Sequence, residues 1–178
     1  MMKARKKEEY KVQPALCLDF DGTIRYSKRG RIINRPEDVA LFDGVEEQIW
    51  SYKDQGYLVF GITNQGGVAY GFKNEEKWQA ELAQTVGLFE RDPFDHVAFS
   101  LLHPKGRIKP YNHRSLLRKP EIGMLAACEV AMFQQGIIVD WDNSIFVGDR
   151  PEDEECANRA GLEFIHADVF FGREEAAS

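Results

Sequence analysis

The sequence predicts an α/β protein: a three-layer, Rossmann-like parallel sheet of about five strands, with helices on both faces and no cap domain. Apolar runs of strand length alternate with longer segments of helical pattern, as in an open parallel sheet. The runs are continuously apolar, which is typical of strands covered on both faces. No repeat, low-complexity tract or linker interrupts the 178 residues, a length that suits one domain.

Five apolar runs are the predicted strands, and three of them end in polar residues. The runs are 15–18, 57–62, 96–99, 144–147 and 162–165. In open parallel sheets, ligands bind beyond the carboxyl ends of the strands. The polar residues after the first, second and fourth runs are therefore the first candidates for a functional site.

Four segments between the runs are predicted helices. Gly56 and Gly161 stand where glycines that end helices are expected. Pro151 suits a first helical turn, and the acidic residues after it suit the positive end of a helix. The predicted helices are 44–55, 74–87, 120–135 and 152–160.

The domain boundaries are predicted from composition. Residues 1–13 are expected to form a flexible basic segment, 14–172 a single folded domain, and 173–178 a flexible tail. The basic cluster of the first segment is interpreted as a solvated terminus, with weak contact to a polyanion as the alternative. Its members are Lys3, Arg5, Lys6 and Lys7.

The composition argues against several function classes. A formal net charge of −6 disfavours a surface built mainly to hold nucleic acid. Neither a signal peptide nor an apolar run long enough to span a membrane is present in the sequence, so no membrane association is expected. Three separated cysteines form no Cys-x-x-Cys pair, which makes a reducing, cytoplasmic location the simpler interpretation.

The first predicted strand ends in Asp19 and Asp21, followed by Gly22 and Thr23. Residues i and i+2 of an extended chain point to the same side, so both carboxylates can face one site. Carboxylates held together repel, which favours a shared proton or a bound cation. A surface turn is the alternative for this segment alone. A calcium loop is excluded because the further acidic ligands are missing at the required spacing.

Phosphate-binding residues are predicted at two further places. Thr63 and Asn64 precede Gln65-Gly66-Gly67, where a hydroxyl, backbone N–H groups and glycines suit an anion, with a plain turn as the open alternative. Arg118 and Lys119 precede a proline and a predicted helix, where two cations suit a phosphate. A solvated basic turn is the alternative for this pair.

The fourth predicted strand ends in Gly148-Asp149-Arg150, and Asp153 follows one helical turn later. Asp149 adds an oxygen ligand for a hard cation such as Mg²⁺. Ordinary acidic charge at a helix N-terminus is the alternative for Asp153.

These four pieces, in this order, resemble the haloacid dehalogenase (HAD) superfamily of phosphotransferases over about residues 15–170. The segment Leu18-Asp19-Phe20-Asp21-Gly22-Thr23 is similar to the first motif, and Gly148 through Asp153 is similar to the fourth. Thr63 and Lys119 are similar to the second and third motifs. These two motifs are short, and they support the resemblance because all four motifs occur in the same order along the chain. The resemblance implies a hydrolase of phosphoric monoesters.

The resemblance also implies catalytic roles. Asp19 would attack phosphorus and form an aspartyl-phosphate, and Asp21 would protonate the leaving oxygen and then activate water. Thr63 and Lys119 would bind the transferring phosphoryl oxygens. The cofactor would be Mg²⁺, held by the Asp19 carboxylate, the Asp21 backbone carbonyl and Asp149.

Supporting roles follow from the same resemblance. Asp153 would orient Lys119 or metal-bound water rather than bind the metal directly. The remaining residues expected to hold substrate or phosphate are Asn64, Arg118 and Arg150.

Within the superfamily, the chain resembles a capless branch that contains D-glycero-D-manno-heptose 1,7-bisphosphate, histidinol-phosphate and polynucleotide 3′-phosphatases. About twenty residues separate Gly22 from the helix predicted near Gly44, which leaves no room for a folded cap. The site should be open, with specificity set by short loops. The stretches that carry this likeness are 41–45, 63–67, 103–106 and 118–124.

That branch often carries a zinc loop, and zinc is not expected here. The positions that match its Cys-x-His and Cys-x-Cys pairs cannot build a tetrahedral zinc site. His103 and His113 remain in the loop, and a rebuilt metal site there is the minor alternative. The loop 101–117 is therefore the least certain substrate-facing segment. The matching positions are Ser100, Leu102, Ser115 and Leu117.

The leading hypothesis is a monomer that hydrolyses a small sugar phosphate or bisphosphate. The runner-up is a polynucleotide 3′-phosphatase, because the segment 103–119 is strongly basic and offers Tyr111 as a stacking residue. A third hypothesis is a phosphate-binding module without turnover. It ranks low because every catalytic motif residue is present.

Overall fold

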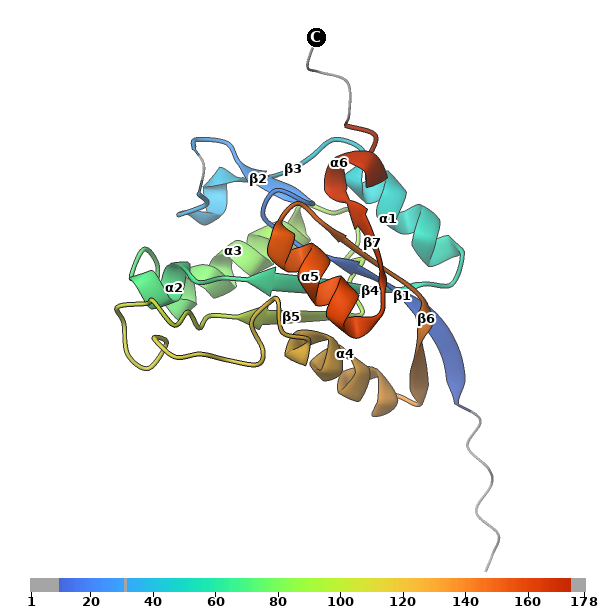
Figure 1. The fold of residues 1–178 in the computed structure, drawn as a ribbon. Helices are drawn as coiled ribbons and strands as arrows, with labels where there is room; N and C mark the ends of the chain where they lie inside the picture. The colour runs from blue at the N-terminus through green and yellow to red at the C-terminus, as the bar shows by residue number, and fades with distance from the viewer. Residues whose placement is uncertain (1–9, 31, 174–178) are drawn as a thin grey trace, which may run out of the picture.

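The computed structural model describes residues 10–30 and 32–173, and its centre is a sheet of five parallel strands (Figure 1). The strand order is β5-β4-β1-β6-β7, so β1 lies in the middle, between β4 and β6. All five predicted strands are present. Their bounds are β1 Lys11–Leu18, β4 Leu58–Asn64, β5 His96–Ser100, β6 Ile137–Gly148 and β7 Glu163–His166.

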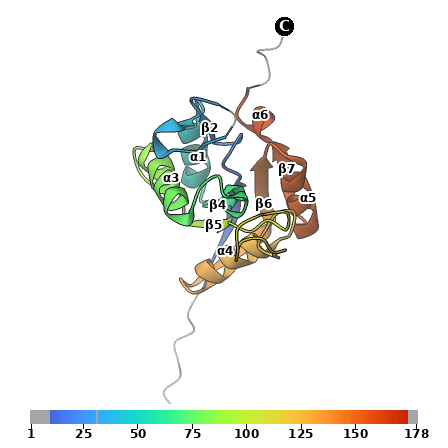
Figure 2. The same ribbon diagram turned by 90° about the vertical axis from the view of Figure 1, so that its left-hand side faces the viewer.

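Alternate side chains of the strands enter two separate apolar cores. In β1, Ala15 and Cys17 belong to one core, and Leu16 and Leu18 belong to the other. The first core is covered by α4 (Gly123–Phe133) and α5 (Pro151–Ala160). The second is covered by α1 (Val45–Asp54), α3 (Glu75–Gly87) and α6 (Ala167–Phe170) (Figure 2). The predicted three-layer fold is confirmed.

The four predicted helices are present, with shifted starts. The largest shift is in α4, which begins at Gly123 and not at residue 120. Residues 118–122 form turns instead, because Glu121 N–H donates to Arg118 O and Gly123 N–H donates to Leu116 O. Three short helices, α2 (Gly67–Tyr70), η1 (Pro36–Asp38) and α6, were not predicted. Within the described part of the chain, no helix combines the length and apolar character that a membrane crossing needs.

A small antiparallel hairpin occupies the segment between β1 and α1. Its strands are β2 (Arg25–Ser27) and β3 (Val39–Leu41), and η1 lies between them. Three-residue strands are too short to give a recognisable alternating pattern, which is why the sequence did not predict them. Over residues 10–30 and 32–173 no cap domain is present, in agreement with the prediction.

Both predicted flexible ends contribute ordered residues. β1 begins at Lys11, because residues 11–13 pair with 137–139 of β6, so the sheet starts before the predicted boundary at residue 14. At the other end, the Arg173 guanidinium donates to Thr23 O at 2.5 Å and so lies against the turn after β1. The basic cluster within residues 1–9 and the tail 174–178 lie outside the described residues.

Candidate active site

The polar strand ends meet at one edge of the sheet. Asp19 follows β1, Thr63 and Asn64 end β4, and Asp149 follows β6. These three strands are neighbours and parallel, so their carboxyl ends open on the same side. In Figure 1 the arrows of β4 and β5 point toward α2, which lies at this edge.

The turn after β1 depends on Gly22. Its φ of 95° lies in the region that favours glycine. A Cβ at this position would stand 2.3 Å from Asp149 Oδ2, so any other residue would displace that carboxylate. Asp19 is fixed from the other side, because its N–H donates to Val147 O at 3.0 Å. The turn therefore brings Asp19 and Asp149 together at the sheet edge.

Lys119 is the buried centre of the site. Its Nζ donates to Asp19 Oδ1 at 2.6 Å and to Ile62 O at 2.7 Å, and it pairs with Asp153 Oδ1 at 2.6 Å. The Asn64 side chain fixes the Lys119 backbone, since it accepts from Lys119 N–H at 3.0 Å and donates to Lys119 O at 3.1 Å. Asn64 thus holds Lys119 in place, and its predicted contact with phosphate stays a prediction.

Asp153 connects Lys119 to the end of β6. Besides its ion pair with Lys119, its Oδ2 accepts the backbone N–H groups of Asp149 at 3.2 Å and Arg150 at 3.1 Å. The latter bond also caps the N-terminus of α5. The contact with Lys119 is the one that the predicted orienting role of Asp153 requires.

Three carboxylates form a group that could hold a metal ion. Asp19, Asp149 and Asp153 each offer an oxygen, and these oxygens lie within 4.8 Å of one another. Thr23 Oγ1 lies between two of the carboxylates, 3.3 Å from Asp19 Oδ2 and 3.4 Å from Asp149 Oδ1. An all-oxygen, acidic donor set suits a hard cation such as Mg²⁺. The residues present therefore fit the predicted ion. Asp19 and Asp149 are its predicted ligands, and Asp153 lies beside them with its oxygens engaged by Lys119 and by backbone N–H groups.

The proton affinities reflect this crowding. Burial raises the pKa of the Asp19 carboxyl to about 7, although the Lys119 ammonium opposes the shift. Burial alone would lower the pKa of Lys119, but the carboxylates of Asp19 and Asp153 outweigh it and raise that pKa. Burial also raises the pKa of Asp149. A cation bound among these carboxylates would favour their ionised forms and so lower these pKa values.

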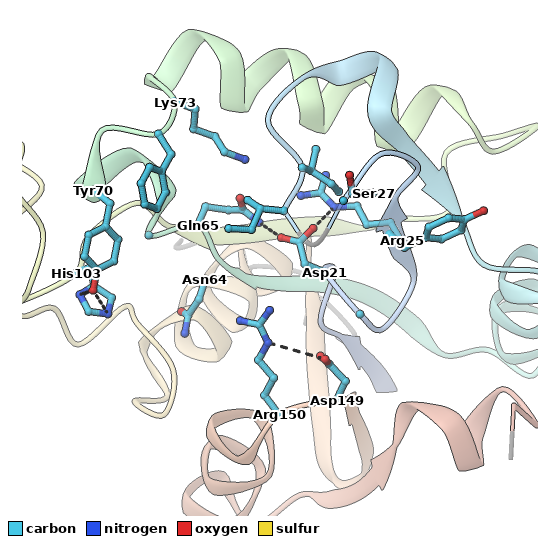
Figure 3. A pocket seen from close by; sticks show the side chains of 18 of the residues that line it. Asp21, Arg25, Ser27, Asn64, Gln65, Tyr70, Lys73, His103, Asp149 and Arg150 are labelled. Atoms are coloured by element: carbon cyan, nitrogen blue, oxygen red, sulfur yellow. Dashed lines mark hydrogen bonds and ion pairs between the residues drawn. The ribbon is translucent and has the colours of Figure 1, made fainter. Parts of the chain in front are cut away.

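Asp21 lies outside this carboxylate group and faces a cavity. Its Oδ1 accepts from Arg25 Nε at 2.8 Å and its Oδ2 accepts from Gln65 Nε2 at 2.7 Å, as Figure 3 shows. Burial would raise the pKa of Asp21, but Arg25, Gln65 and Lys73 together hold it below its usual value. Arg25 was not among the predicted site residues, because a charged residue four positions after Asp21 belongs to none of the four motifs.

The cavity has a volume of about 460 Å³ and opens in front of Asp21 and Asp149. Arg118 and Arg150, both predicted to hold substrate, line it. The Tyr70 and Phe72 rings also line it and stack with centroids 5.7 Å apart. Neither aromatic residue was predicted, since no pattern marks them before the loop is folded. Other residues at the wall are Ile32, Lys73 and His103.

The zinc-loop positions carry no metal-ligating group in the described residues. The Tyr70 hydroxyl lies 3.1 Å from His103 Nδ1, which gives that histidine a hydrogen-bonding partner. His113 is exposed. Across residues 10–30 and 32–173, the three aspartates are the one group of at least three His, Cys, Asp or Glu side chains that lie close enough together to share an ion. The expectation of no zinc stays a prediction.

Comparisons with known sequences show which proteins this chain resembles. Residues 15–176 match the family model described as polynucleotide kinase 3 phosphatase. The D-glycero-alpha-D-manno-heptose-1,7-bisphosphate 7-phosphatase of Burkholderia mallei is 32% identical over 150 residues, which covers 83% of this chain and 76% of that protein. The D-glycero-beta-D-manno-heptose-1,7-bisphosphate 7-phosphatase of Photorhabdus laumondii is 31% identical and covers 84% and 77%.

Solved structures show the same fold. A HAD-like phosphatase from Mesorhizobium loti superposes with a TM-score of 0.73 at 27% identity, covering 85% of this chain and 70% of that one. The D,D-heptose 1,7-bisphosphate phosphatase from B. bronchiseptica, complexed with magnesium and phosphate, gives a TM-score of 0.67 at 20% identity, covering 86% of this chain and 78% of that one. At that identity the second likeness supports the fold alone.

Proposed function

This chain belongs to the polynucleotide kinase 3 phosphatase family, and we propose that it hydrolyses a small phosphorylated sugar through an aspartyl-phosphate on Asp19. It is a phosphatase, as its named relatives are, and its structure resembles a HAD-like phosphatase. The observation that carries the finer proposal is the bond of Lys119 Nζ to Asp19 Oδ1, with Asp149 and Asp153 beside it. A nucleophile, a fixed cation and oxygen ligands for Mg²⁺ thereby share one edge of the sheet.

In the first step, an Asp19 oxygen attacks phosphorus and the bond from phosphorus to the leaving oxygen breaks. Once the anionic substrate phosphate lies beside it, Asp21 binds a proton. It gives that proton to the leaving oxygen, so the sugar leaves as an alcohol. Lys119 Nζ and the Thr63 hydroxyl bind the phosphoryl oxygens, where charge builds up in the transition state. Thr63 is buried beside Gln65, whose Nε2 donates to its Oγ1 at 3.0 Å.

In the second step, a water molecule attacks the phosphorus of phospho-Asp19. Asp21, now ionised, takes a proton from that water, and the phosphorus–Asp19 bond breaks to release inorganic phosphate. Asp19 and Asp149, together with the Asp21 carbonyl, would hold Mg²⁺, while Asp153 keeps Lys119 in place. When bound, the ion would offset repulsion between the anionic nucleophile and the anionic phosphate.

A second anionic group on the substrate is supported by the cavity. The Arg118 and Arg150 side chains both line it, beyond the buried end that holds Lys119. Two guanidinium groups in one wall suit a phosphate away from the reacting one, because the planar fork binds phosphate in a bidentate manner. The heptose bisphosphate named in the relatives has such a group, so a sugar bisphosphate is the proposed substrate class.

A substrate panel tests this proposal. We expect phosphate release from heptose 1,7-bisphosphate or a related sugar bisphosphate to exceed release from the matching monophosphate in kcat/KM. Activity should vanish in chelator and return with Mg²⁺. Full activity in chelator, or no preference for any sugar phosphate over a simple aryl phosphate, would contradict the proposal.

Hydrolysis at nucleic-acid 3′ ends is the second candidate, and one surface feature favours it. The loop beside the cavity exposes Lys105, Arg107, Lys109 and Arg114. Tyr111, expected to stack on bases, is tied down instead, since its hydroxyl donates to Glu75 at 2.8 Å. This candidate predicts that a 3′-phosphorylated oligonucleotide is the better substrate and that its hydrolysis falls steeply with salt. If DNA fails to compete with a sugar phosphate, the candidate is excluded.

A further inference from the structure

We propose that Arg25 is a positioning residue that holds the Asp21 carboxylate toward the leaving group of the substrate. This inference rests on the proposed function, in which Asp21 is the acid and base. Arg25 Nε donates to Asp21 Oδ1 at 2.8 Å, while Gln65 Nε2 donates to Asp21 Oδ2 at 2.7 Å. With both oxygens engaged, the carboxylate has one orientation (Figure 3).

The exposures of the pair indicate which partner serves the other. The Arg25 side chain is 0% exposed, whereas the Asp21 side chain is 33% exposed and faces the cavity. Arg25 therefore presents no exposed surface with which to touch a substrate in this arrangement. It holds the carboxylate from behind, and Asp21 alone of the two can touch the reacting atoms.

Arg25 is itself held in place by two residues of α3 and by Phe20. Its Nη1 donates to Thr85 Oγ1 at 2.6 Å, and its guanidinium carbon lies 5.1 Å from the centre of the Phe20 ring and 5.4 Å from that of Trp78. A cation between aromatic rings is stabilised by their negative faces. Thr85 is oriented in turn, because its hydroxyl donates to Glu81 O at 2.7 Å.

The inner face of α3 is unusual for a core-facing helix surface. Trp78, Glu81 and Thr85 follow a spacing of three and four residues, so they share one face, and each is 0% exposed. Burying a carboxylate and a hydroxyl is costly unless they are paired. Glu81 pairs with the Lys73 ammonium, and Thr85 with Arg25. The helix thus buries polar side chains where apolar ones would pack more simply. Of this face, Thr85 and Trp78 contact Arg25.

This arrangement has a kinetic consequence that ordinary structural support lacks. A leaving group such as 4-nitrophenolate departs without a proton, whereas an alkoxide needs one from Asp21. Misplacing the Asp21 carboxylate should therefore slow alkyl phosphates far more than aryl ones. The ratio kcat/KM isolates this step, because it reports only events up to formation of phospho-Asp19.

The experiment compares 4-nitrophenyl phosphate with an alkyl phosphate, such as glycerol 2-phosphate, in saturating Mg²⁺. For Arg25→Met we expect kcat/KM to fall about 100-fold on the alkyl substrate and less than about 5-fold on the aryl one. Arg25→Lys should recover part of the loss, since it restores charge without the fork. Thr85→Val keeps Arg25 and removes its hydrogen-bond acceptor, so kcat/KM should again fall mainly on the alkyl substrate, by about 5-fold. If Arg25→Met fails to fold, the Thr85→Val result tests the positioning role in its place.

Two further variants separate positioning from general damage. In an Asp21→Asn background, Arg25→Met should cost nothing more on the alkyl substrate, because its effect passes through Asp21. Ile49→Val, a core change on the same face of the sheet, should affect both substrates equally.

The outcomes distinguish this inference from the proposed function. Equal losses on both substrates for Arg25→Met, together with a selective loss for Asp21→Asn, would overturn the role of Arg25 alone. If Asp21→Asn itself showed no leaving-group dependence, the acid role of Asp21 would be wrong, and the role of Arg25 would be overturned with it. An additive loss in the double variant would also overturn positioning.

Discussion

The buried end of the site and its rim differ in how firmly their side chains are held. Asp19, Thr63, Lys119 and Asp153 are at most 6% exposed, and Lys119 alone makes three contacts to fixed oxygens. At the rim, Phe72 is 59% exposed and Ile32 55%. We therefore expect the residues of the buried end to carry out the reaction. We expect the residues of the rim, which have few fixed contacts, to select the substrate.

The largest expected effect comes from removing the nucleophile at the buried end. Asp19→Asn should lower turnover by at least about 10⁴-fold on every substrate, because no other group can accept the phosphoryl. Phosphate release and acid-stable trapping of the phosphoenzyme would measure it. Asp54→Asn, on the exposed side of α1, is the matched control and should retain full activity. Substantial turnover by Asp19→Asn would mean that the buried end does not set the reaction.

The next effect concerns the metal. Asp149→Asn keeps the shape of the side chain and removes one charge from the three-carboxylate group. We expect the Mg²⁺ concentration for half-maximal activity to rise about 10- to 100-fold, the range typical of disturbed metal sites. A magnesium titration of activity measures it, and a titration of intrinsic fluorescence or thermal stability gives a readout independent of turnover. An unchanged titration would place the ion elsewhere.

The buried end could largely be predicted from the sequence, because its residues follow strands directly. Asp19 and Asp149 come just after continuous apolar runs, and parallel strand ends must meet at one edge. Lys119 could be proposed as a phosphate-binding cation from the sequence, but its catalytic role came only through the family resemblance, since it lies in a turn before α4 and not at a strand end. The structure adds its bonds to Asp19 and Asp153, which no spacing in the sequence indicates.

The support behind Asp21 could not be predicted for a physical reason. Arg25 meets Thr85 across 60 residues, and Gln65 meets Asp21 across 44. Such contacts depend on how α3 and the β2–β3 hairpin pack, and the hairpin strands are too short to leave a pattern. Sequence alone also favours an exposed position for Arg25, because arginine is rarely buried without a partner.

A smaller effect is expected at the rim. Arg150→Ala should raise KM about 10-fold for a sugar bisphosphate and leave the monophosphate nearly unchanged, since its half-exposed side chain would lose only the second phosphate. Steady-state kinetics on the paired substrates measures it. Arg114→Ala is the control, because Arg114 is a more exposed cation that pairs with Glu121. Equal losses on both substrates would assign Arg150 to the reacting phosphate. They would contradict the expectation that the rim binds only the second phosphate.

The smallest expected effect is on stability, and it also separates the two regions. Burial raises the pKa of Asp19 from 3.8 to about 7, so its ionised form is less favourable in the folded state than in the unfolded chain. The sign follows: the stability that goes with protonated Asp19 is full below about pH 4 and is lost as the pH rises through 7. In chelator, Asp19→Asn should therefore melt above wild type by an amount that grows between pH 5.5 and pH 8.5.

A gain of about 1 kcal/mol corresponds to roughly 2–4 °C in a chain of this size, which thermal unfolding monitored by circular dichroism resolves easily. The comparison with wild type at each pH removes the contributions of other groups that titrate in this range, such as His103, whose pKa burial lowers. Phe72→Ala, at the rim, should leave the melting temperature and its pH dependence unchanged, because its ring is mostly exposed. A gap between Asp19→Asn and wild type that stayed constant with pH would show that the buried end does not hold Asp19 at an unfavourable charge.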